Sequence, residues 1–157
     1  MTEQRIGWLW VVAQFVLLAV LLIMPWQAHP LWLMSLGGLT AVAGGLLALS
    51  VSRTLGTAFT ATPVPRTGAH LSRGGPYRYL RHPMYAGLLL IVLGLLIAAG
   101  PPIAWAWGIV LAAFFWLKSR WEDRALHRTY GGTWQEWADR TGAFIPRRHP
   151  RSPRADG

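Results

Sequence analysis

Polar and aromatic side chains are concentrated in residues 74–87, which read GGPYRYLRHPMYAG and lead directly into an apolar run. Placing such side chains at a membrane boundary is costly, so they usually serve a function. Pro83 suits the first position of a helix and holds His82 just outside helical geometry. The imidazole and the nearby amides would then lie at the positive end of a helix dipole, which favours a bound anion such as a carboxylate or phosphate.

A second group of candidates contains Glu122 and Asp123, the chain's one adjacent acidic pair, close to Lys118, Arg120 and Arg124. One interpretation is a solvated cluster of surface ion pairs, which would contribute little to stability. The other is that these carboxylates form one wall of a pocket. The same choice exists for residues 81–82, because arginine and histidine before a membrane helix can also act as interfacial anchors.

The composition is typical of a membrane protein. Hydrophobic residues make up 53% of the 157 residues and charged residues 13%, compared with about 25% charged in soluble domains. Ten tryptophans agree with this, since tryptophan favours the membrane–water interface. The absence of cysteine excludes disulfides and thiolate metal sites. The net charge of +9 comes from arginines that flank apolar runs, so we expect no nucleic-acid partner.

Four uncharged apolar runs are visible, and they cover Ile6–Met24, Leu31–Val51, Met84–Ala99 and Ile103–Leu117. About 20 apolar residues cross a bilayer, so the first two fit full crossings and the last two are short. The basic n-region and cleavage site of a signal peptide are missing from the first run, so we expect a retained helix. In the second run Gly37, Ala41 and Gly45 recur on one face, which either allows close helix packing or reflects common membrane composition.

These runs predict an all-α polytopic membrane bundle of about four transmembrane helices plus a short C-terminal helical region. Lysine and arginine gather in residues 53–81 and 118–154, so the positive-inside rule places both termini in the cytoplasm. We expect one domain over residues 1–149 and a basic flexible tail over 150–157. After a helix over Trp121–Tyr130, a capping box from Thr133 to Glu136 predicts a new helix that ends near Gly142.

This topology brings the polar stretch before the third run to the same membrane face as the segment after the fourth. The two runs form a hairpin about Gly100–Pro102, so their ends should be neighbours. Six side chains could then converge, namely Tyr77, Arg81, His82, Tyr85, Arg120 and Glu122. The sequence has no GxGxxG loop for a Rossmann nucleotide site and no HExxH zinc motif.

The two polar segments resemble the signature blocks of the isoprenylcysteine carboxyl methyltransferase superfamily, which includes the phospholipid N-methyltransferases. The first block is GGPYRYLRHPMYAG. The second is matched by Glu122-Asp123-Arg124-Ala125-Leu126, Tyr130-Gly131, Trp134, Trp137 and Phe144-Ile145-Pro146. The similarity covers residues 69–146. The chain departs from the pattern at Asp123, where the family has a second glutamate, and at two tryptophans that replace tyrosines.

The resemblance implies an integral membrane enzyme that uses S-adenosylmethionine. It implies that the cofactor-binding residues are His70, Leu71, Tyr77, Arg81, His82, Pro83, Met84, Tyr85 and Glu122, and that the catalytic residues are Lys118, Arg120 and Glu122. Lys118 occupies the place where an arginine engages the acceptor in eukaryotic relatives, and Arg120 is the nearest guanidinium. Glu122 suits the ribose hydroxyls, and a tyrosine ring can stack on adenine or face the sulfonium.

We therefore expect a methyltransferase, in a membrane we expect to be the bacterial inner membrane, that acts on a lipophilic or small acceptor such as a carboxylate, amine or thiol. Membrane lipids are the other expected partners. Methyl transfer needs positioning more than a protein nucleophile. An amine acceptor would need a base, for which His82 and Glu122 are the candidates. The alternatives are an NADPH-dependent sterol-type reductase-like protein and a non-catalytic accessory protein on the same scaffold.

Overall fold

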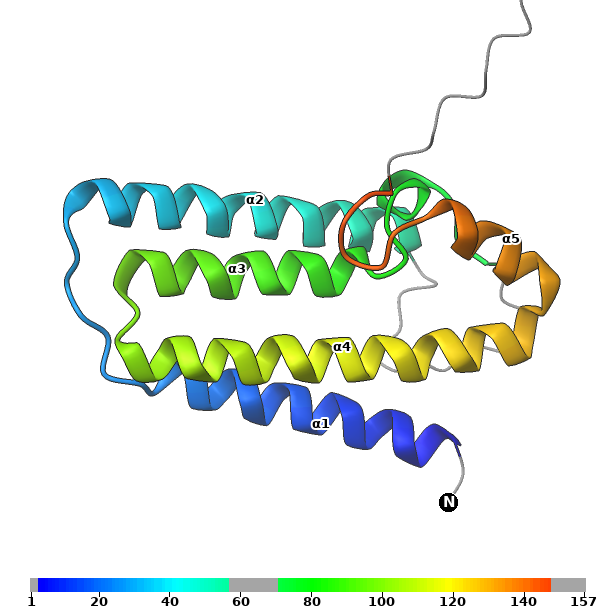
Figure 1. Cartoon of the computed structure of the whole chain (residues 1–157), viewed down its shortest axis with the longest axis horizontal. Helices are drawn as coiled ribbons and strands as arrows, with labels where there is room; N and C mark the ends of the chain where they lie inside the picture. The colour runs from blue at the N-terminus through cyan, green and yellow to red at the C-terminus, as the bar shows by residue number, and fades with distance from the viewer. Residues whose placement is uncertain (1–2, 57–70, 148–157) are drawn as a thin grey trace, which may run out of the picture.

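The computed structural model describes residues 3–56 and 71–147. Its elements are α1 (Glu3–Leu22), α2 (Leu31–Leu55), the short 3-10 helix η2 (Gly75–Arg78), α3 (Pro83–Ala99), α4 (Pro102–Tyr130) and α5 (Gly132–Arg140). Helices α1 to α4 run side by side, and α5 lies across one end of α4 (Figure 1). The all-α membrane bundle is confirmed. The predictions for His70 and for the tail at 150–157 fall outside the described residues.

Within the described residues, three helices are long and apolar enough to cross a membrane by length and composition: Gln4–Leu22, Leu31–Leu55 and Pro102–Tyr130. Helix α3 has 17 residues, which at about 1.5 Å per residue gives about 25 Å against a hydrocarbon core of about 30 Å. Many apolar side chains on α1 and α2 are exposed, Phe15 and Leu39 among them. Such large apolar surfaces fit contact with lipid tails.

Helix α4 is continuous over 29 residues, so the fourth apolar run and the expected helix over Trp121–Tyr130 are one element. At about 1.5 Å per residue it is about 43 Å long, and its final turns extend beyond the length that a bilayer core covers. It ends at Gly131, whose φ of 53° favours glycine. The C-terminal ends of α2 and α4 and the start of α3 gather at one end of the bundle, together with η2 and α5 (Figure 1). We call this the charged end of the bundle, because Arg53, Arg81, Lys118, Glu122 and Asp123 lie in these segments.

The predicted capping box is wrong. Helix α5 begins at Gly132 with Gly131 as its N-cap and no side-chain capping bond. The amides of Trp134 and Gln135 donate to the Gly131 carbonyl, each at 3.2 Å, so the helix has already started when Thr133 is reached. The C-terminal end of α5 lies close to Gly142, where the sequence predicted it, because Thr141 is the C-cap and Gly142 follows it directly.

Glycines allow α2 and α3 to approach at backbone distance. A Cβ atom added to Gly37 would lie 2.4 Å from the Gly94 carbonyl oxygen, and one added to Gly44 would lie 2.5 Å from that of Gly87. The expected small-residue face is therefore right for Gly37 but wrong for Gly45, where an added Cβ meets open space. At about 3.6 residues per turn, position 44 stays over the contact whereas position 45 rotates away from it.

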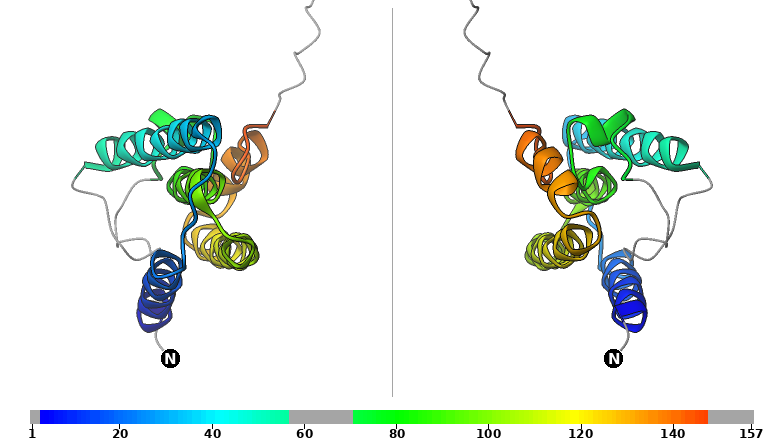
Figure 2. Two further views of the ribbon diagram at one scale, coloured as in Figure 1. Left: turned by 90° about the vertical axis from the view of Figure 1, so that its left-hand side faces the viewer. Right: turned by 90° about the vertical axis from the view of Figure 1, so that its right-hand side faces the viewer.

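The other helices pack through side chains. The core that joins α1, α3 and α4 consists of Leu21, Val92, Leu96, Ala104, Leu111 and Phe115. The Trp107 indole also donates to the Leu17 carbonyl at 2.9 Å, which ties α4 to α1. End-on views show α4 lying between α1 and α5, with α3 beside it (Figure 2). Helix α4 is thus the element against which the functional residues are arranged.

Replacing Gly44 with leucine should lower the thermal midpoint of the purified protein by at least about 5 °C, because overpacking costs on the order of 2 kcal/mol. Gly45→Leu is the matched control, since its side chain would enter open space. A similar loss in both variants, measured by thermal unfolding in one detergent, would contradict the assigned α2–α3 contact.

Candidate active site

The two signature blocks are joined by backbone pairing at the charged end of the bundle. Leu80 forms a parallel bridge with Gly142. The amide of Arg81 donates to the Gly142 carbonyl at 2.7 Å, and that of His82 donates to the Ala143 carbonyl at 3.0 Å. A Cβ on Gly142 would lie 1.6 Å from the Ile145 carbonyl oxygen, so only glycine fits the turn. This contact places the segment before α3 beside the segment after α5.

His82 lies at the centre of this junction with 4% of its surface exposed. Its Nε2 is 2.9 Å from Oδ1 of Asp123, and its Nδ1 is 3.3 Å from Oε2 of Glu122. The ring stacks on Tyr85 at 5.5 Å and contacts Phe144 at 6.0 Å between ring centroids. One imidazole therefore connects α3, the last turns of α4 and the segment that follows α5.

The pKa of His82 is raised to about 9. Burial alone lowers this pKa, but the hydrogen bonds and negative charges of Asp123 and Glu122 outweigh it. Contacts from both ring nitrogens to carboxylates fit the doubly protonated ring. His82 is then an imidazolium at neutral pH and holds its protons, which leaves Glu122 as the candidate base.

The acidic pair is not a solvated surface cluster. The side chains of Glu122 and Asp123 are 21% and 14% exposed, and their partners are His82 and Arg81 rather than their neighbours on α4. Asp123 was considered as part of the acidic pair but was not among the predicted site residues, yet it lies closer to the His82 ring than Glu122 does. Its adjacency to Glu122 was the available signal, but the pairing across 41 residues is not visible in sequence.

Arg81 holds the C-terminal end of α5. Its Nη1 donates to the carbonyls of Ala138 at 2.9 Å and Thr141 at 2.7 Å, and its Nε lies 3.5 Å from Oδ2 of Asp123. A cation suits the last carbonyls of a helix, where the dipole is negative. Arg81 is thus a part of the junction and not an interfacial anchor.

Lys118 points into the bundle and is 2% exposed. Its ammonium donates to Oε1 of Gln14 at 2.5 Å and lies 5.1 Å from the centroid of the Tyr85 ring. The Tyr85 hydroxyl lies beside the Glu122 carboxylate. Gln14 is the one amide in the first apolar run, and a polar side chain at that depth is expected to serve a partner or a function.

Arg120 is exposed on another face of α4, with its guanidinium 5.5 Å from the Trp116 ring. The structure therefore separates the two cations between which the sequence could not choose. Lys118 lies with Tyr85 and close to Glu122, whereas Arg120 lies elsewhere.

The remaining predicted residues surround this cluster. Tyr77 lies in η2, where its carbonyl accepts a 3.1 Å bond from the Trp137 indole. Burial, and then the charge of Glu122, raise the pKa of the Tyr77 phenol, so it stays neutral. Leu71 and Tyr77 pack against Trp134 and Trp137. Pro83 and Met84 form the first turn of α3.

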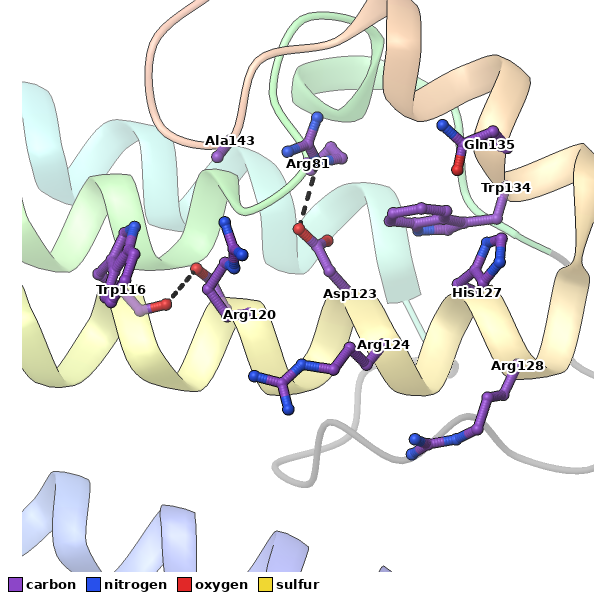
Figure 3. Close-up of a pocket in the computed structure, with 11 residues that line it drawn as sticks. Arg81, Trp116, Arg120, Asp123, Arg124, His127, Arg128, Trp134, Gln135 and Ala143 are labelled. Carbon is purple, nitrogen blue, oxygen red and sulfur yellow. Dashed lines mark hydrogen bonds and ion pairs between the residues drawn. The ribbon is translucent and has the colours of Figure 1, made fainter.

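A cavity of about 630 Å³ lies between α4 and α5, and we call it the α4–α5 cavity (Figure 3). Its lining residues are Arg81, Trp116, Ser119, Arg120, Asp123, Arg124, His127, Arg128, Trp134, Gln135 and Ala143. Of the predicted site residues that the structure describes, only Arg81 and Arg120 belong to this set. The lining residues on α4 recur every three or four positions between Trp116 and Arg128. This spacing places them on one face of a helix, so they could have been predicted if α4 had been expected to continue without a break.

This geometry defines a class of protein: an all-helical membrane protein with a histidine–carboxylate junction at its charged end. A family model described as phospholipid methyltransferase matches residues 32–133, more than half of the 157-residue chain. The chain therefore belongs to the phospholipid methyltransferase family. Helix α1 and the segment from residue 134 onward lie outside the matched range.

Three similar proteins agree with this assignment. The chain is 29% identical to protein-S-isoprenylcysteine O-methyltransferase B of Arabidopsis thaliana over 118 residues, which are 73% of this chain and 60% of the relative. The chain is 25% identical to protein-S-isoprenylcysteine O-methyltransferase A of the same plant over 132 residues, which are 82% of this chain and 67% of that protein. The solved structure of the eukaryotic intramembrane Ras methyltransferase ICMT shares the fold with a TM-score of 0.68 at 20% identity, covering 92% of this chain and 50% of that one. The chain thus spans between half and two thirds of the length of these proteins.

The positive charge on His82 should make the protein less stable as the pH rises through the alkaline range. Because the folded pKa of about 9 exceeds the usual 6.5, this contribution is complete below pH 6.5 and is lost as the pH rises through 9. The shift corresponds to on the order of 3 kcal/mol. We expect the thermal midpoint to fall between pH 7 and pH 10 in the parent protein and in His127→Gln, and to fall much less in His82→Gln. Equal slopes in all three would contradict the assignment.

Proposed function

We propose that this protein is an S-adenosylmethionine-dependent methyltransferase that acts on a lipophilic or small acceptor at the charged face of the membrane. The observation that carries the proposal is the buried His82 contact with Glu122 and Asp123, which joins both signature blocks in one site. Family membership and the similarity to two isoprenylcysteine O-methyltransferases support it. The lysine- and arginine-rich end faces the cytoplasm in this proposal, by the positive-inside rule.

The chemistry of the residues fits this cofactor. Glu122 is held by His82 through Oε2 while its side chain stays 21% exposed, so a carboxylate is available to ribose hydroxyls. The neutral rings of Tyr77 and Tyr85 offer faces to adenine or to a sulfonium. Leu71 would border the cofactor, and Arg81, His82, Pro83 and Met84 complete the proposed set. When bound, S-adenosylmethionine supplies an electrophilic methyl group, and the protein supplies positioning.

The proposed catalytic roles follow from where the side chains lie. Lys118 is a cation in the bundle interior, held by Gln14, and would orient an acceptor that arrives laterally from the bilayer. Glu122 would accept a proton from an acceptor that must lose one, because His82 keeps its own. Arg120 lies on the face of α4 that lines the α4–α5 cavity, so it would act on the acceptor less directly than Lys118. The packed tryptophans at 134 and 137 would limit water.

Calorimetric titration of the purified protein with S-adenosylhomocysteine tests the proposal. We expect saturable binding that Glu122→Gln weakens by at least about tenfold, through loss of a charge-assisted bond. Glu136→Gln, on the exposed surface of α5, is the matched control and should bind as the parent does. Absence of binding by a protein with an intact thermal transition would contradict the proposal, as would displacement of the ligand by NADPH.

A further inference from the structure

The α4–α5 cavity has a strongly positive lining. Four arginines contribute to it (Arg81, Arg120, Arg124 and Arg128) against one carboxylate, that of Asp123. Both oxygens of this carboxylate already have cationic partners, Oδ1 at the His82 ring and Oδ2 at Arg81. Arg120 and Arg124 are exposed residues of the lining. In Figure 3 Arg120 extends toward the side of α5, whereas Arg124 extends from the other side of α4. Such a surface favours a ligand with negative charge and oxygen acceptors.

One buried donor in the lining, the indole Nε1 of Trp134, has no hydrogen-bond partner in the described structure. Trp134 is only 9% exposed, and its ring is held edge-on against His127 at 5.4 Å between centroids. Its side chain lies at the cavity in Figure 3. An indole can only donate, and buried donors are rarely left unpaired. An acceptor oxygen in the cavity would satisfy it.

The cavity continues toward the membrane interior as an apolar strip. Along α4 the exposed side chains of Ile109, Ala112, Ala113 and Trp116 precede Arg120 at helical spacing. Ile109 is 73% exposed and Trp116 is 52% exposed. The guanidinium of Arg120 over the Trp116 ring marks the change from apolar to charged surface. Arginine beside tryptophan is typical of the depth at which lipid headgroups lie.

A charged cavity above an apolar strip matches an amphiphile with an anionic head, and basic pockets between membrane helices bind such headgroups. We propose that the α4–α5 cavity binds the phosphodiester of an anionic phospholipid, whose chains lie along the Ile109–Trp116 strip. Of the eight described residues proposed to hold the cofactor, only Arg81 lines this cavity. Arg120 is the one residue of the proposed catalytic set in the lining, whereas Lys118 and Glu122 are not part of it. The lipid is therefore a resident ligand and not the methyl acceptor, and its binding requires no cofactor.

Native mass spectrometry of the detergent-purified protein tests this, with dioleoyl phosphatidylglycerol as the probe and the zwitterionic phosphatidylcholine as the reference lipid. We expect the parent to retain phosphatidylglycerol at least about fivefold more strongly than phosphatidylcholine. Arg124→Gln and Trp134→Phe should each weaken retention of phosphatidylglycerol by about tenfold. Arg140→Gln, an exposed arginine of α5 outside the cavity, is the matched control and should leave retention unchanged.

Four results would overturn the proposal. Equal retention of the two lipids would show that the cavity does not select for negative charge. Retention that is unaffected by Arg124→Gln would place the lipid elsewhere, and this exposed substitution remains informative if Trp134→Phe fails to fold. Displacement of phosphatidylglycerol by glycerol phosphate would indicate a soluble phosphate ligand, and displacement by S-adenosylhomocysteine would assign the cavity to the cofactor. The lipid test stands apart from the calorimetric one, so the two proposals can fail separately.

Discussion

The buried contact of His82 with Glu122 and Asp123 is the interaction on which the charged end of this protein depends. The two adjacent carboxylates are only 21% and 14% exposed, and charges at such low exposure are costly unless a cation lies beside them. The imidazolium supplies that cation. Since His82 directly precedes α3 and its amide bonds to Ala143, the same residue fixes where α3 starts and where the segment after α5 returns. Arg81 adds the connection to the end of α5.

Helix α4 distributes the functional side chains between two faces. One face carries Lys118 and Glu122 toward α1 and α3, and the other carries Arg120 and Asp123 toward the α4–α5 cavity. This division is possible because α4 extends beyond the apolar core of the bundle without a break. It separates the proposed site of methyl transfer from the proposed lipid site, and His82 and Arg81 lie between them. Helix α1, outside the family match, contributes Gln14 to the first of these sites.

The apolar runs and the two signature blocks were sufficient to predict the membrane bundle, the family and the convergence of His82, Tyr85 and Glu122. The continuity of α4 past Lys118 was also open to prediction, because no glycine or proline interrupts the sequence from there to Tyr130. Other features depend on information that local sequence does not contain. The contact at Gly44 instead of Gly45 depends on how α3 crosses α2. The direction of Lys118 depends on Gln14 of α1, and only helix packing determines where that residue lies.

The protonation state of His82 is the most direct test of this account. It can be read by NMR of protein labelled with ¹⁵N at histidine, with the His82 signals assigned by their loss in His82→Gln. We expect both ring nitrogens of His82 to carry protons at pH 7.5 and the ring to titrate near pH 9. A neutral imidazole at pH 7.5, in a folded protein, would show that no buried cation joins the two blocks.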